Sequence, residues 1–245
     1  MAISRRNRKS RKSMKTRKNR ARKVYRAKKS NSYAGAIRIK RLGQLIRIGN
    51  DPTTSGGNPV VTASGNGSLS LGTSSSDTML TRQIGGAMVF KLSSATDFGD
   101  FANLFDRYKI TGVKLQFLYQ CNIANNDSTS GTNALPLISY SFDGDDANIP
   151  ASLDEVQKKQ YCHQKILNGN YMFSVYLKPR ILKEVYNSAL STGYNSAKAT
   201  WLDSAVPDTP HYGLKMWLNN WGSGNTKFQQ LTITPTYYLA LKDTQ

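Results

Sequence analysis

The sequence predicts an all-β protein: an antiparallel jelly-roll sandwich of about eight strands that follows a disordered, basic N-terminal arm. Residues 1–47 contain 19 Lys and Arg and no Asp or Glu, whereas residues 48–245 contain 15 basic and 15 acidic residues. Strand-length runs with alternating apolar residues recur through residues 48–245. Only two short segments have helical spacing, so a parallel sheet with crossover helices is not expected. The chain therefore divides into an arm, residues 1–47, and a sandwich domain, residues 48–245.

The arm is too polar to fold by itself. Residues 4–30 contain 15 Lys and Arg and almost no large apolar side chains, so burial cannot offset the entropy of ordering the segment. Lys and Arg attract phosphates without reading base sequence, and binding releases condensed counterions. We expect salt-dependent nucleic-acid binding by Arg5, Arg6, Arg8, Lys9, Arg11, Lys12, Lys15, Arg17, Lys18, Arg20, Arg22, Lys23, Arg26, Lys28 and Lys29.

Four other roles of so basic a segment can be compared with its sequence. Its Lys/Arg clusters at 5–9 and 20–23 match nuclear import signals, a role compatible with nucleic-acid binding. A mitochondrial transit peptide is amphipathic, whereas basic residues would surround a helix here on all sides. A purely solvating tail does not require so many charges of one sign. No run approaches the roughly 20 apolar residues of a membrane span.

In the first half of the chain, alternation at 36–40, and in part at 45–48, predicts that the first strand begins here, with basic side chains on one face. Short strands are expected at 59–62 and 68–71 between Gly-rich loops, and a compact apolar strand at 87–92. The spacing of Phe98, Phe101, Leu104 and Phe105 predicts a short helix, with Asp97 as its cap. A long strand follows at 108–120, with a bulge at Thr111-Gly112.

In the second half, a strand is expected at 134–142, where Pro136 favours an edge or a strand start. Ser152 and Glu155 form a capping box for a short helix. Strands at 161–166 and 171–178 flank a predicted turn at Asn168-Gly169, and residues 186–210 are expected to be mostly loop. The last two strands, 212–221 and 228–241, are joined by a predicted hairpin turn at 222–225.

Two groups of residues in the sandwich domain are candidate sites. Asp143, Asp145 and Asp146 form an acidic turn that is solvated, contacts a neighbouring subunit or binds a cation; the sequence leaves these alternatives open. Aromatic residues at strand spacing are expected mainly in the core, although they could also stack on bases. They are Tyr161, Tyr171, Phe173, Tyr176, Trp217, Trp221, Tyr237 and Tyr238.

The sequence predicts no enzyme and no cofactor. It has two histidines, His163 and His211, and no nucleophile-elbow, zincin or phosphate-loop motif. A metal-dependent enzyme on a jelly roll would need clustered His and carboxylate ligands. The two cysteines, Cys121 and Cys162, are expected to be reduced, buried thiols rather than a disulfide framework.

Five short segments occur in a recognisable order: FDRYKITGVKL at 105–115, FDGDD at 142–146, KPR at 178–180, WLD at 201–203 and PHYGLK at 210–215. Together with the arm, they resemble the capsid proteins of circovirus-like circular single-stranded DNA viruses. The arm mixes Lys with Arg, whereas the vertebrate circovirus type is dominated by Arg. The resemblance therefore points to circovirus-like relatives without indicating a genus.

The resemblance implies a jelly roll that assembles with copies of itself, about sixty of them, into a small icosahedral shell with its arms facing the genome. Sixty arms of +19 would carry roughly 1,100 positive charges. The implied partners are single-stranded DNA rather than RNA, the nuclear import machinery and an unknown host receptor. The implied locations are the virion and, during assembly, the host nucleus. The alternative function is a cellular chromatin- or ribosome-associated protein that binds nucleic acid through a basic tail.

Overall fold

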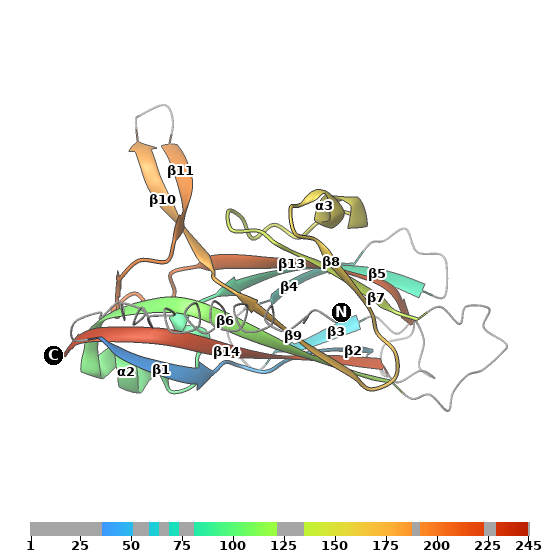
Figure 1. Cartoon of the computed structure of the whole chain (residues 1–245), viewed down its shortest axis with the longest axis horizontal. Helices are drawn as coiled ribbons and strands as arrows, with labels where there is room; N and C mark the ends of the chain where they lie inside the picture. The colour runs from blue at the N-terminus through green and yellow to red at the C-terminus, as the bar shows by residue number, and fades with distance from the viewer. Residues whose placement is uncertain are drawn as a thin grey trace, which may run out of the picture. The chain divides into compact units, whose positions relative to one another are not determined.

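Seventeen elements make up the part of the chain that the computed structural model describes, residues 36–50, 59–63, 69–73, 81–121, 135–187, 192–222 and 229–244 (Figure 1). Their strands form two antiparallel sheets. Sheet I contains β1 (Ile37–Leu42), β2 (Ile46–Asn50), β3 (Pro59–Ala63), β6 (Phe105–Cys121), β9 (Tyr171–Leu177), β12 (Leu202–Asp203) and β14 (Gln229–Thr244). Sheet II contains β4 (Leu69–Thr73), β5 (Thr81–Phe90), β7 (Leu137–Phe142), β8 (His163–Ile166), β10 (Arg180–Asn187), β11 (Thr192–Lys198) and β13 (His211–Gly222).

The strand order is that of a jelly roll. In sheet I, β14 lies between β6 and the pair β1 and β2, and β9 pairs with the other edge of β6. In sheet II, β13 lies between β5 and β7, and β8 pairs with β7. Strands that follow one another in the chain therefore mostly change sheets, as the winding of a jelly roll requires. This confirms the predicted fold class.

Alternation along the long strands fills the space between the sheets. On β6, Tyr108, Ile110, Val113, Leu115, Phe117 and Tyr119 are all buried and point toward sheet II. The inward face changes parity at Thr111, where the register with β14 slips and the Thr111 hydroxyl donates a 2.8 Å hydrogen bond to the Tyr238 carbonyl oxygen. The predicted bulge is confirmed.

Three short helical segments accompany the sheets: η1 (Leu92–Ser94), α2 (Phe98–Leu104) and α3 (Leu153–Lys158). The capping box of α3 is confirmed, because the Ser152 hydroxyl accepts from the Glu155 amide and the Glu155 carboxylate accepts from the Ala151 amide. Helix α2 is present, but Asp97 has a left-handed backbone with φ 59° and makes no side-chain cap hydrogen bond. No helix in the described residues is both long and apolar enough to span a membrane.

Three predictions about connections were wrong. The strands on either side of 168–169 are β8 in sheet II and β9 in sheet I, so that turn closes no hairpin. The same holds for 222–225, because β13 and β14 belong to different sheets. Part of 186–210, predicted as loop, contains β11, which pairs with β10 to form a hairpin that projects from the two layers (Figure 1).

The sandwich unit begins at Ile37. Strands β1 and β2 pair with β14, so residues 37–42 and 46–47 of the predicted arm belong to sheet I. The alternation of Ile37, Ile39 and Ile46 with basic residues is the signal of these strands. From here on, "arm" means residues 1–36.

Candidate nucleic-acid interface

The fifteen predicted arm residues, Arg5 to Lys29, lie outside the described residues. The structure describes the strand that follows the arm in the chain. Ala36 is followed directly by β1, an edge strand that pairs with β14 in register Ile37 with Leu241 and Leu42 with Thr236. The arm is therefore covalently attached at the edge of sheet I.

The outer face of sheet I is basic. Ile39, Ile46 and Ile48 point into the sandwich, so their neighbours Arg38, Lys40 and Arg47 point away from it. On β6, Lys109 and Lys114 alternate with buried residues in the same way. The register places Arg38 and Lys109 on either side of Ala240, and Arg47 and Lys114 near Thr232 and Thr236 of β14. We call Arg38, Lys40, Arg47, Lys109, Lys114 and Lys242 the basic face.

A tyrosine pair lies on the same side of the sheet. Tyr176 of β9 meets Tyr238 of β14 edge-on, with ring centroids 5.7 Å apart, and Tyr176 is 55% exposed. Gly112 lies between them on β6, and a Cβ atom there would collide with the Tyr176 hydroxyl. The pair therefore requires a glycine at 112. An exposed tyrosine beside Lys and Arg can stack on a base while the cations contact phosphates.

Most of the other aromatic candidates serve packing, and Tyr161 does not. Trp217, Trp221 and Tyr237 are buried, and Phe173 stacks on Phe117 with centroids 4.7 Å apart. Tyr161 is exposed on the chain leading to β8, and Tyr171 lies beside Phe173 with centroids 5.8 Å apart. Of the eight aromatic candidates, Tyr176 and Tyr238 are therefore the two that the structure brings next to the basic face.

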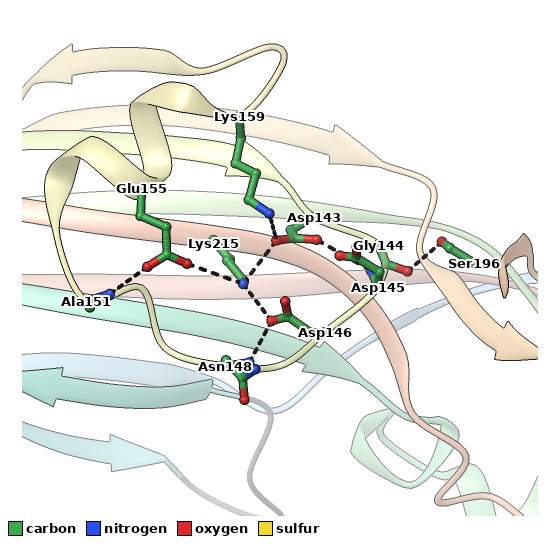
Figure 2. A network of polar contacts seen from close by, with 10 residues as sticks. All are labelled: Asp143, Gly144, Asp145, Asp146, Asn148, Ala151, Glu155, Lys159, Ser196 and Lys215. Carbon is green, nitrogen blue, oxygen red and sulfur yellow. Dashed lines mark hydrogen bonds and ion pairs between the residues drawn. The ribbon is translucent and has the colours of Figure 1, made fainter. Parts of the chain in front are cut away.

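The acidic turn proves to be a buried ion-pair network rather than a simple solvated turn. Segment 143–159, which includes α3, covers the outer face of sheet II (Figure 2). Lys215, on β13, is only 2% exposed, and its Nζ lies 3.0 Å from Asp143 Oδ2 and 2.6 Å from Asp146 Oδ1. Lys159 Nζ lies 2.9 Å from the same oxygen of Asp143, and Glu155 approaches Lys215 at 3.9 Å.

The ionisation of these groups follows from their contacts. Burial acts to raise the pKa of Asp143, but hydrogen bonds from Asp145, Lys159 and Lys215 hold it well below the usual range. The hydrogen bond to Asp143 raises the pKa of Asp145. Burial acts to lower the pKa of Lys215, but its bonds to Asp146 and Asp143 outweigh this effect and raise it. Asp143 is therefore a carboxylate held between two ammonium groups.

The structure shows a role for the acidic turn that was not among the three alternatives: its carboxylates pair with a buried lysine of the same chain. Asp143, Asp145 and Asp146 do come together, with ligand atoms within 4.8 Å. The cation among them is the ammonium of Lys215, which satisfies Asp143 and Asp146. The available signal was one lysine in the apolar strand segment Gly213-Leu214-Lys215-Met216-Trp217, because a buried lysine needs an acidic partner.

The remaining candidate chemical groups are dispersed. His211 is buried on β13 beside Tyr108, whereas His163 lies on β8 beside Tyr140. Cys121 and Cys162 are free thiols and partly exposed, rather than buried as predicted.

Solved capsid proteins of several viruses are similar to this chain in structure. The BFDV capsid protein in its 60-mer form aligns with a TM-score of 0.49 and 12% identity over 85% of this chain and 94% of that one. The decameric BFDV form gives a TM-score of 0.46 and 12% identity over 84% and 99%, and the mud crab tombus-like virus gives 0.40 and 12% over 86% and 82%. A search of curated proteins gave no match. The model of the circovirus capsid protein family matches residues 3–245, so this chain belongs to that family and is a structural, non-enzymatic component of the virion.

Proposed function

We propose that this capsid protein self-assembles into a small icosahedral shell of about sixty copies and packages circular single-stranded DNA through its basic arm. The observation that carries the proposal is the separation of charge. Fifteen Lys and Arg lie within residues 4–30, whereas residues 48–245 contain 15 basic and 15 acidic residues. The BFDV capsid protein is known both as a 60-mer and as a decamer, which supports assembly of this chain.

The basic face extends the proposed interface. The arm joins sheet I at β1, where Arg38 and Lys40 begin the basic face, and Tyr176 and Tyr238 lie on the same side. We expect bound single-stranded DNA to contact the basic face and the exposed ring of Tyr176 in addition to the arm. Because all these contacts are to phosphates and ring faces, we expect little base-sequence preference.

The proposal also places the protein in the host nucleus during assembly. The clusters at 5–9 and 20–23 have the composition of nuclear import signals. The partners are then the import machinery, the viral genome and further copies of the chain. The host receptor is a further partner, and no described residue identifies it.

Deleting residues 2–36 tests the arm. At physiological salt, single-stranded DNA binding is expected to weaken by about 10³-fold or more, and the slope of log K against log salt to fall by roughly 0.7 for each lost phosphate contact. Fluorescence anisotropy over a salt series measures both quantities, and the same deletion should abolish nuclear accumulation of a fluorescently tagged chain. The matched control is Lys114→Gln in the full chain. It removes about one phosphate contact, so the slope of log K against log salt should fall by roughly 0.7.

Assembly separates the proposal from its cellular alternative. The full chain should form uniform particles in electron microscopy, with nucleic acid that nuclease cannot reach. A monomer at every salt concentration would argue for the chromatin- or ribosome-associated function. Unchanged DNA affinity after arm deletion would overturn the packaging role of the arm.

A further inference from the structure

The β10–β11 hairpin is a basic projection from sheet II. Among its described residues, Arg180, Lys183 and Lys198 are basic and exposed, and Glu184 is the one acid. Tyr194, opposite Glu184, is 63% exposed. Figure 1 shows the hairpin rising from the β13 side of the sandwich, away from the sheets. A two-stranded ribbon is marginal in water by itself, so a projecting one gains stability from whatever covers it.

The base of the hairpin is fixed in direction. The Ser196 hydroxyl donates a 2.7 Å hydrogen bond to the Gly144 carbonyl oxygen, in the same segment whose Asp143 is held by Lys215 and Lys159 (Figure 2). The side chain of Arg180 packs against Gly144, where a Cβ atom would lie 2.7 Å from it, and its guanidinium lies over Phe142 at 5.7 Å. The ion-pair network thus anchors a projection in which β10 and β11 pair mainly with each other.

The end of sheet I around α2 carries four exposed aspartates, Asp97, Asp100, Asp106 and Asp203. Two arginines lie among them: Arg107 pairs with Asp243, and Arg41 lies over the ring of Phe101. Helix α2 buries no residue fully. Three apolar side chains of this region, Leu42, Leu104 and Val206, are more than half exposed. Hydrogen bonds hold the region together, from Thr96 to the Leu42 carbonyl oxygen and from Ser204 to that of Asp106. We call this surface the acidic end.

We propose that the β10–β11 hairpin of one copy docks on the acidic end of a neighbouring copy in the shell; this inference rests on the proposed assembly. The two surfaces are complementary, since one offers lysines around a tyrosine and the other aspartates around exposed apolar groups. Figure 1 shows them on opposite sides of the sandwich, the hairpin beyond β13 and α2 beyond β1 and β14. Two different patches that face away from each other form a head-to-tail contact, which closes into rings when the rotation allows. Exposed apolar side chains rimmed by charge are typical of such contacts.

Charge reversal on each surface tests the docking. The double variant Lys183→Glu with Lys198→Glu, and the double variant Asp100→Lys with Asp106→Lys, should each lower the assembled fraction at least tenfold. Combining all four substitutions in one chain restores the complementarity and should restore particles. Sedimentation velocity and electron microscopy measure assembly, and circular dichroism of the unassembled chain confirms folding. The matched control reverses the exposed pair on α3, Asp154→Lys with Lys158→Glu, and should assemble like the unmodified chain.

Each outcome decides the proposal. Failure of the combined variant to assemble better than either double variant overturns the docking, as does normal assembly of either double variant. If a reversed chain does not fold, the neutral versions, with Gln for the two lysines or Asn for the two aspartates, must raise the critical concentration for assembly and reduce its dependence on salt. If the unmodified chain forms no particles, the proposed shell fails; if it forms particles and the swaps have no effect, only the docking fails.

Discussion

Replacing Lys215 by methionine is expected to lower the free energy of unfolding by about 3–5 kcal/mol, because it leaves the buried carboxylate of Asp143, and the partly exposed one of Asp146, without their main cation. Methionine keeps most of the length of the side chain, so the loss of charge dominates over the loss of packing. Asp143 would retain one partner, Lys159, whose side chain is 36% exposed and therefore more screened by water. Urea unfolding of the unassembled chain, followed by tryptophan fluorescence, measures the change.

Two further variants separate charge from shape. Lys159→Met removes the exposed partner, and should cost no more than about 1 kcal/mol. Adding Asp143→Asn and Asp146→Asn to Lys215→Met removes the uncompensated charges together with the cation, and should recover most of the lost stability. A loss below about 1 kcal/mol for Lys215→Met alone would show that the network does not stabilise the fold.

The network also bears on assembly. Asp143 and Gly144 are adjacent, and Gly144 accepts the hydrogen bond from Ser196 at the base of the hairpin. If the β10–β11 hairpin makes the contact between copies, loosening of segment 143–146 would leave the orientation of the hairpin less well fixed. Lys215→Met would then weaken assembly at temperatures at which the sandwich is still folded.

Local patterns in the sequence predicted the elements better than their partners. The alternation of β6 identified the inward face, and the slip at Thr111 identified the bulge, because both are properties of consecutive residues. Asn168-Gly169 reads as a hairpin turn, yet the chain there passes from sheet II to sheet I. Which sheet a strand joins depends on partners far away in the sequence, such as β13 for β7. Local periodicity contains no such information.

Strand β11 and the role of the acidic turn could not be predicted from the sequence, for related reasons. Strand β11 has the sequence TGYNSAK, which lacks a clear apolar face, and its Tyr194 is 63% exposed. The role of the acidic turn depended on Lys215, which lies 72 residues from Asp143 in the chain. By contrast, Arg38, Lys40 and Arg47 could be placed on the outer face of a strand from alternation alone, because their isoleucine neighbours mark the buried side.

Acid is expected to destabilise the sandwich through His211 between about pH 6.5 and pH 4. His211 is fully buried on β13, and its Nδ1 lies 3.0 Å from the Thr209 carbonyl oxygen, which fixes the proton on that nitrogen. Burial lowers the pKa of His211 from 6.5 to about 4, although the backbone oxygens of Thr209 and Phe90 act in the opposite direction. Between these values the unfolded chain binds a proton that the native chain does not. Stability is therefore complete above pH 6.5 and falls with decreasing pH until about pH 4.

The size and the assignment of this effect can both be measured. The difference between the two pKa values corresponds to about 3 kcal/mol. Urea midpoints of the unassembled chain at pH 7 and pH 4.5 should show most of that loss, whereas His211→Asn, which can still donate to Thr209, should flatten the dependence. The exposed His163→Asn is the control and should follow the unmodified chain. The lowered pKa of Asp143 acts in the same direction but only below about pH 3.8, its ordinary value. A loss that persists unchanged in His211→Asn would therefore assign the acid sensitivity to another group.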